Sequence, residues 1–315
     1  MRAVLAFAAS CVGLLALSLI TVLWPGLQWW QSWGPGVPVK NYVTQSAEFA
    51  IAAFFLFYLS IDAWKAGAYR RSIAACLIAS TFIVFMLFIV TSRTELFAIA
   101  ALIVVFGARL YGWRGLLFGV ATLGVIALIA WDTSSYLRTR ITKTESDMQT
   151  YLSDTVFTST GYRLEFLKKS ITFIKAAPVF GHGSGSIKPL FEQAAAGKSG
   201  ISAVVTSNPH NQIFAVAIQL GLIGAVILCG MWLAHFLMFV GPGATAWFGL
   251  VVVIQNITGS LFNTHLFDFT EGWIYVCCVG ALGGTCLRNI DLPLAPEQSS
   301  LGVFERLLPK KYIAK

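Results

Sequence analysis

The sequence predicts an all-α integral membrane protein: a polytopic bundle of about eight transmembrane helices with one large exterior loop that contains an amphipathic helix. Two observations predict this class. The 315-residue chain is 57% hydrophobic and only 11% charged, whereas soluble chains carry roughly 25% charged residues. Eight apolar stretches also approach the length of about 20 residues that crosses a bilayer.

The eight stretches divide the chain around the loop, with five before it and three after it. They are residues 4–23, 47–64, 73–90, 96–108, 116–131, 212–239, 244–262 and 273–287. We therefore expect four regions. These are N-terminal transmembrane helices over 1–131, a large exterior loop over 132–211, C-terminal transmembrane helices over 212–290, and a cytoplasmic tail over 291–315.

Basic residues set the expected orientation, because short cytoplasmic loops carry an excess of Lys and Arg. With eight crossings, four basic regions fall on one side, which is then the cytoplasm. They are Arg2, the loops at 65–71 and 109–114, and the basic tail. The loop over 132–211 lies outside, and its own basic residues do not contradict this because long loops escape the charge rule. All the cysteines fall inside predicted spans, so no disulfide framework is implied.

An amphipathic helix is predicted within the exterior loop, over residues 162–176. Its apolar stripe, at helical spacing, is Leu164, Leu167, Ile171 and Ile174, and Phe166 and Phe173 widen it. Its basic residues are Arg163, Lys168, Lys169 and Lys175. Thr-Ser-Thr at 158–160 supplies N-cap candidates, and Pro178 ends the helix. Basic amphipathic helices commonly lie in the membrane interface, so we expect this one to lie on anionic headgroups.

Two arginines are candidate anion ligands. Arg93 sits at the exterior tip of a hairpin of spans, where a buried charge is costly and needs a partner. It is either an interfacial residue paired with Glu95 or a phosphate ligand, because guanidinium forks match phosphate oxygens. Arg163 is either part of a solvated face or a second anion ligand, because a helix N-terminus already favours anions.

His210 is the main candidate for acid–base chemistry. It stands in Asn-Pro-His-Asn at 208–211, directly before an apolar helix that Asn211 is expected to help cap. A histidine at the mouth of a span is either a structural imidazole or a general base. In isolation the structural role is the more frequent one, but the ordinary pKa near 6.5 allows this histidine to accept a proton at neutral pH, so both interpretations stay open.

Four further residues are candidate substrate contacts: Lys40, His182, His265 and Asn211. For Lys40 a snorkelling anchor is the favoured interpretation, and for His182, which lies in a glycine turn, a structural role is favoured. His265 shares the last exterior loop with two carboxylates, Asp268 and Glu271. The pattern predicts no metal site, because no His-Glu-x-x-His motif or dense exterior carboxylate set is present.

Three motifs in a fixed order carry a family resemblance. They are Ser92-Arg93-Thr94 between two spans, Gly161-Tyr162-Arg163-Leu164-Glu165 in the loop, and Pro209-His210-Asn211 before Gly221-Leu222-Ile223-Gly224. This order resembles the O-antigen ligase and O-antigen polymerase family of membrane glycosyltransferases. The resemblance covers roughly residues 39–287. Family members commonly have more spans before the large loop than this chain has.

The resemblance implies glycan transfer from undecaprenyl diphosphate to the lipid A-core oligosaccharide, in the periplasm, at the bacterial inner membrane. It implies an inverting and metal-independent reaction without a cofactor. His210 would deprotonate the acceptor hydroxyl, while Arg93 and Arg163 would hold the diphosphate. The expected partners are the carrier-linked glycan, the lipid A-core acceptor and membrane lipids. No nucleic acid is expected, and the oligomeric state is not indicated.

Three alternatives stay open at this point. An O-antigen or capsule polymerase would use the same donor with a second carrier-linked glycan as acceptor. A protein O-oligosaccharyltransferase would glycosylate a protein, although the residues at 40–45 look more like the ligase branch. A lipid-linked glycan transporter would bind the diphosphate without chemistry, but it would predict inverted repeats and broken helices at mid-membrane, and the sequence shows neither.

Overall fold

The computed structural model describes residues 2–24, 26, 35–39, 41–90, 92–152 and 158–291, and all the regular structure in these residues is helical. This confirms the predicted all-α class. The helices are α1 (Arg2–Leu23), α2 (Tyr42–Lys65), α3 (Tyr69–Phe88), α4 (Arg93–Thr133), α5 (Ser135–Leu152), α6 (Ser159–Ala176), α7 (Ile187–Ala195), the 3₁₀ turn η1 (Gly200–Ala203), α8 (Gln212–Met238), α9 (Ala244–Ser260) and α10 (Phe269–Asp291). Nearly all of the predicted tail over 291–315 lies outside the described residues.

Helices lie at all eight predicted stretches, but fewer of them qualify as membrane spans on their own. Among the described residues, α1, α2, α3, α4 and α8 are long and apolar enough to cross a bilayer. Helix α9 is apolar but has only 17 residues, and α10 has Glu271 in its first turn and Arg288 in its last turn. The expected count of about eight crossings therefore stays a prediction, as does the exterior placement of the loop.

Helix α4 contains two of the predicted stretches, folded back on each other. Its backbone is not helical at Tyr111 and Gly112. A Cβ added to Gly119 would lie 3.0 Å from the Cα of Val104, whereas a straight helix would separate these residues by about 22 Å. The two halves of α4 therefore form an antiparallel hairpin, in which small residues allow the backbones to approach closely.

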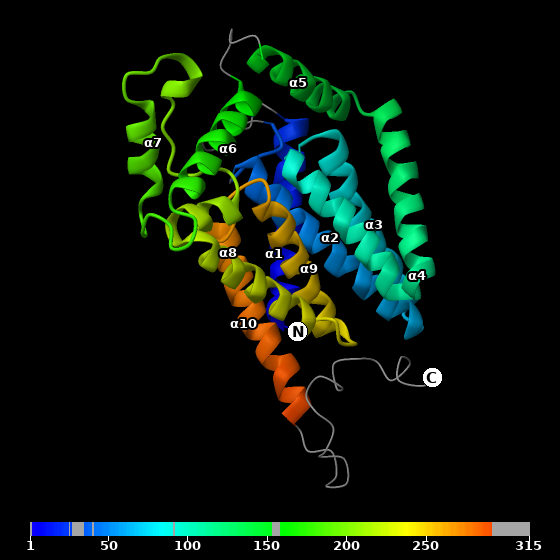
Figure 1. Ribbon diagram of the computed structural model, residues 1–315. Coiled ribbons are helices and arrows are strands. Elements are labelled where there is room, and N and C mark those ends of the chain that lie inside the picture. The colour runs from blue at the N-terminus through cyan, green and yellow to red at the C-terminus, as the bar shows by residue number, and fades with distance from the viewer. Residues whose placement is uncertain are drawn as a thin grey trace.

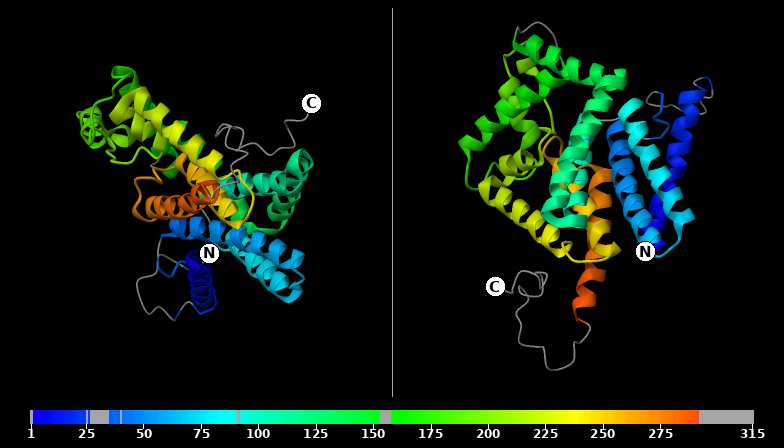
Figure 2. Two further views of the ribbon diagram at one scale, coloured as in Figure 1. Left: turned by 90° about the horizontal axis from the view of Figure 1, so that it is seen from below. Right: turned by 90° about the vertical axis from the view of Figure 1, so that its right-hand side faces the viewer.

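The centre of the bundle is built from α2 and α9. Phe55 and Phe248 lie with their ring centroids 4.2 Å apart, and the indole N–H of Trp247 donates to the Phe54 carbonyl oxygen at 3.1 Å. These side chains are almost completely buried. Figure 2 shows α1 against α2, on the opposite side of the molecule from α6 and α7.

The insertion between α4 and α8 forms a separate layer at one end of the bundle. Its helices α5, α6 and α7 gather at the end shown uppermost in Figure 1, opposite the C-terminal end of α10. A second apolar core joins α6 and α7 to the first half of α8; it consists of Phe166, Phe173, Ile187, Phe191, Ala215 and Ile218. The insertion is thus packed onto α8 rather than suspended above the membrane.

The predicted amphipathic helix forms as α6, with Thr158 as its N-cap, but its faces differ from the prediction. Phe166 and Phe173 face the protein, whereas Leu167 and Ile171 of the predicted stripe are about two-fifths exposed. Lys169, which was expected on the basic face, is buried. Its ammonium donates to the carbonyl oxygens of Ser202 and Val204 and pairs with Glu165 at 3.9 Å, so an ion pair and two carbonyls compensate its burial.

Helix α8 is broken at Gly221, and the glycine turn over 178–185 fills the break. Gly221 has φ +66° and ψ −166°, so the carbonyls before it lose their helical donors. The turn replaces these donors, because the backbone N–H groups of His182 and Gly183 donate to the carbonyls of Ile218 and Gln219 at 2.9 Å. In return, the Leu222 N–H donates to the Pro178 carbonyl at 2.8 Å.

We predict that Gly221→Ala destabilises the fold. A Cβ at this position would lie 2.0 Å from the Val179 carbonyl oxygen, and φ is positive, so the cost should exceed about 1 kcal/mol. Gly230→Ala is the matched control on the same helix, because no atom lies within 4 Å of its added Cβ. Thermal unfolding of the purified protein should show a clear drop in Tm for Gly221→Ala only. Equal Tm values would contradict the role of the break.

Candidate active site

His210 is held at the entrance to α8 by its own loop. Asn211 caps α8 as expected, because its side-chain oxygen accepts from the Phe214 N–H at 3.0 Å. His210 has φ +56° and is the only described residue other than glycine with a positive φ. The side-chain oxygen of Asn208 accepts from the His210 N–H at 2.8 Å, which supports this strained conformation. Strain of this kind is concentrated at functional sites.

Hydrogen bonds fix the orientation and the tautomer of the His210 ring. The amide nitrogen of Asn263 donates to Asp268 at 3.0 Å. This leaves the amide oxygen of Asn263, Oδ1, facing His210 Nδ1, also at 3.0 Å. An amide oxygen only accepts, so Nδ1 carries the proton and Nε2 keeps its lone pair. The ring also stacks on Phe166, with centroids 6.0 Å apart. Neutral His210 is therefore oriented as a base through Nε2.

Arg163 lies near this ring, on α6. Because α6 starts at Ser159, Arg163 is just beyond the first turn rather than within it as expected. Its guanidinium is half-buried and forms no hydrogen bond or ion pair with any residue that the structure describes. Burial lowers the pKa of Arg163, as does the nearby charge of Arg93, while Tyr42 opposes the shift. Two guanidinium groups with like charge therefore face one region.

Arg93 starts α4 and contacts the insertion instead of Glu95. Its Nη1 donates to the Thr160 hydroxyl at 3.1 Å, and its Nη2 lies 3.9 Å from a carboxylate oxygen of Asp147 on α5. Thr160 in turn donates to the same Asp147 oxygen at 3.2 Å. The Glu95 carboxylate is buried elsewhere and accepts from Gln255 at 3.0 Å, so the salt bridge weighed for Arg93 and Glu95 does not form.

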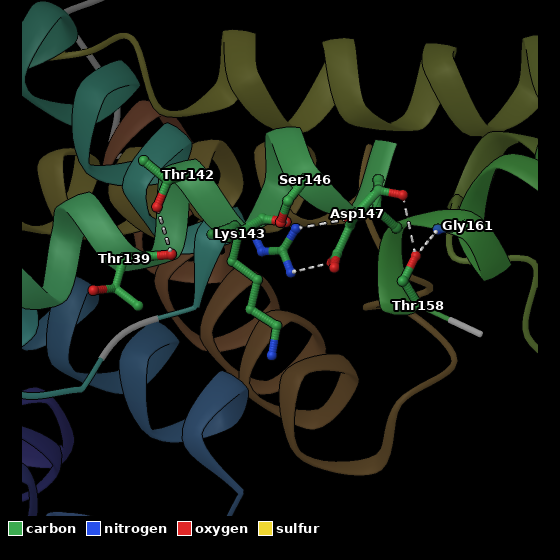
Figure 3. Close-up of polar contacts among 9 residues, drawn as sticks. Thr139, Thr142, Lys143, Ser146, Asp147, Thr158 and Gly161 are labelled. Atoms are coloured by element: carbon green, nitrogen blue, oxygen red, sulfur yellow. Dashed lines mark hydrogen bonds and ion pairs between the residues drawn. The ribbon is translucent and has the colours of Figure 1, made fainter. Parts of the chain in front are cut away.

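The N-terminus of α6 is tied to the same part of α5. Figure 3 shows Thr158 between Asp147 and Gly161: its hydroxyl accepts from the Gly161 N–H at 3.0 Å and donates to the Asp147 carbonyl oxygen at 3.4 Å. The cap of α6 and the ion pair of Arg93 therefore share one residue of α5. This places the start of α6, and with it Arg163, beside the start of α4.

Among the described residues, the structure shows no hydrogen bond or ion pair between the other candidate residues and the side chains of Arg93, Arg163 or His210. Lys40 lies outside the described residues. Both amide atoms of Asn211 are engaged, one in the cap and one with the Leu261 carbonyl. His182 is exposed in the glycine turn, with Nε2 at 2.9 Å from the Phe173 carbonyl. His265 is fully buried, with its ring packed against Gly259.

Two residues of the site were not identified from the sequence. Asp147 belongs to a segment of mixed polar residues over 132–153 whose structure the sequence left undefined, and this segment forms α5. Asn263 follows α9 and carries no motif. The sequence pointed to this part of the site only through Asp268, the hydrogen-bond partner of Asn263, which shares the predicted last exterior loop with His265. Burial and the neighbouring Glu271 raise the pKa of Asp268 to about 6.

The electrostatics favour a neutral imidazole at His210. Burial lowers the pKa of His210, the positive charge of Arg163 lowers it further, and the hydrogen bond with Asn263 opposes both. The base form therefore persists to more acidic pH than for a free imidazole. The cluster can bind an anion through two guanidinium groups and take a proton beside it. The described residues include no group of three His, Cys, Asp or Glu side chains suited to a metal ion.

Comparison with known proteins identifies a family for part of the chain. A family model described as O-Antigen ligase matches residues 74–229. The matched part contains Arg93, Arg163 and His210, whereas Asn263 and Asp268 lie beyond its C-terminal end. No curated protein matches the chain.

We predict that the charge of Arg163 controls the titration of His210. The pKa of His210 should lie below 6.5 and should rise in Arg163→Gln, because a positive charge that disfavours the imidazolium is removed. Lys188→Gln removes the same charge from exposed α7 and should leave this pKa unchanged. NMR titration of ¹³C-labelled histidine would measure the pKa of His210 in the unmodified protein and in both variants, and His210→Gln would assign the signal. An identical pKa in Arg163→Gln would show that the two residues are not coupled.

Proposed function

We propose that this chain, whose residues 74–229 belong to the O-antigen ligase family, transfers a glycan from undecaprenyl diphosphate to a lipid A-core sugar. The reaction would take place on the periplasmic side of the bacterial inner membrane. Family membership supports glycosyl transfer of the ligase or polymerase type by a membrane enzyme. The donor, the acceptor and the sidedness are parts of the proposal.

The observation that carries the proposal is the pairing of an oriented neutral imidazole with two guanidinium groups. Glycosyl transfer from a diphosphate needs a base for the acceptor hydroxyl and positive charge for the leaving group. His210 supplies a free Nε2 next to Arg163. Arg163 has no ion pair among the described residues, and Arg93 pairs with Asp147 at 3.9 Å. The cluster therefore combines both requirements in one place.

The reaction then follows in one displacement. Nε2 of His210 takes the proton from the acceptor hydroxyl, and the hydroxyl oxygen forms a bond to the anomeric carbon of the donor sugar. The bond from that carbon to the phosphate oxygen breaks, and its electron pair leaves with the diphosphate. Arg93 and Arg163 stabilise the negative charge that appears on this oxygen. Attack opposite to the leaving group inverts the anomeric carbon.

Asn263 and Asp268 serve as positioning residues in this scheme. They hold the proton on Nδ1, as an Asp–His pair does in other catalytic sites. When His210 becomes positively charged, the ionised carboxylate of Asp268 stabilises it through Asn263. Because the pKa of His210 is lowered, activity should be retained at neutral pH and fall as the pH drops through a value below 6.5.

The polymerase is the second candidate, and the same cluster would serve it unchanged. It differs only in the acceptor, a glycan on a second carrier lipid. The residues described here favour neither acceptor, so the choice depends on an assay. Incubation of the purified protein with carrier-linked glycan and each acceptor in turn, with chelator present, tests both the reaction and its independence of metal. A product that joins only two carrier-linked glycans would overturn the ligase assignment.

We predict that His210→Gln lowers turnover by about 10²–10⁴-fold, the usual contribution of a positioned base. Glutamine can form hydrogen bonds but cannot take the proton at neutral pH. His235→Gln, near the far end of α8, should retain turnover because it is remote from the cluster. Donor binding should survive in both variants. Near-normal turnover of His210→Gln would show that His210 only positions the substrate.

We predict that Arg93→Lys remains strongly impaired although it keeps the charge, because an ammonium cannot reproduce the fork of two parallel N–H donors. The loss should appear mainly as a higher KM for the donor. Arg70→Lys, an exposed position at the start of α3, is the matched control. Recovery of full activity by Arg93→Lys would reduce the role of Arg93 to charge alone.

A further inference from the structure

Asp147 occupies the place where an anionic substrate would meet Arg93. Its side chain is buried, with 6% exposure, and one of its carboxylate oxygens contacts both Thr160 and Arg93. Arg163 follows Thr160 by three residues on α6, and its pKa responds to the charge of Arg93. The carboxylate of Asp147 is thus an internal anion at the edge of a two-arginine site.

The proposed reaction creates a need for such an anion. In the donor, the terminal phosphate of the diphosphate is esterified to the sugar. Cleavage frees that oxygen, so the product diphosphate carries more negative charge than the donor did. Two arginines that stabilise the leaving group will therefore bind the product more tightly than the substrate. Without a competing group, this attraction would slow product release.

We propose that Asp147 is an internal competitor that pairs with Arg93 when the site is empty and promotes release of the diphosphate product. This inference rests on the proposed function. A diphosphate displaces the carboxylate because it offers more charge and more acceptor oxygens to the same guanidinium. When the product starts to leave, Asp147 returns to Arg93 and Thr160, so that the buried carboxylate regains these two partners.

A purely structural role for Asp147 makes the opposite prediction. If Asp147 only holds Arg93 in place, its removal should weaken diphosphate binding, because a misplaced guanidinium binds less well. If Asp147 competes, its removal should strengthen binding. Asp147→Asn separates the two roles, since an amide oxygen still accepts from Thr160 and Arg93 but no longer carries the charge.

The experiment measures binding of undecaprenyl diphosphate without a glycan to the full-length protein in lipid nanodiscs. Asp147→Asn should bind this probe about fivefold more tightly than the unmodified protein, in the range expected for a partly exposed ion pair. It should also show stronger product inhibition and a lower steady-state kcat, with an unchanged first turnover. Glu145→Gln removes the same charge from an exposed position two residues away on α5 and should change none of these quantities.

A double-mutant cycle identifies the partner. In an Arg93→Gln background, Asp147→Asn should no longer tighten binding, because the two groups compete only through Arg93. Weaker or unchanged binding by Asp147→Asn in the unmodified background would overturn the proposal for Asp147 alone. If Arg93→Gln and Arg163→Gln both bind the probe normally, the diphosphate site itself is wrong, and the proposed function fails together with the inference.

Discussion

Backbone hydrogen bonding within an apolar surrounding is the constraint on which the end of the protein that carries the candidate site depends. The break in α8 at Gly221 leaves carbonyls without donors, and in a membrane protein such groups must be paired by the chain itself. The turn over 178–185 pairs them. This docks the end of α6 onto α8, and the second core then places Phe166 of α6 against the ring of His210.

The second organising principle is the balance of charge in the cluster. Two guanidinium groups and an imidazole lie in one partly buried region, where like charges disfavour one another. The imidazole responds by staying neutral, which is the form that a base requires. Asp147 contacts Arg93 directly, while Asp268 reaches His210 through Asn263. Arg163 forms no ion pair with any residue that the structure describes, so its guanidinium is available to an anionic ligand.

The sequence predicted those features that depend on local patterns. The helices at the apolar stretches, the cap of α8 by Asn211 and the cap of α6 by Thr158 all follow from periodicity and capping chemistry. Features that depend on tertiary pairing were missed or misread. Asn263 meets His210 across 53 residues of sequence, and Asp147 meets Arg93 across another long separation. The charge of Lys169 predicts an exposed side chain. Its burial is explained only by its tertiary contacts with the carbonyls of Ser202, in η1, and of Val204, directly after η1.

The left-handed backbone at His210 has a consequence for how such a site evolves. A histidine with φ +56° occupies a conformation that glycine and asparagine adopt more readily. Replacement by either residue would relax the backbone while removing the base, so selection for folding alone would favour an inactive chain. Under the proposed function, selection for turnover is what retains the histidine. A homologue with Gly or Asn at this position would be expected to fold well and to lack catalytic activity. The residue at this position would therefore distinguish active from inactive homologues.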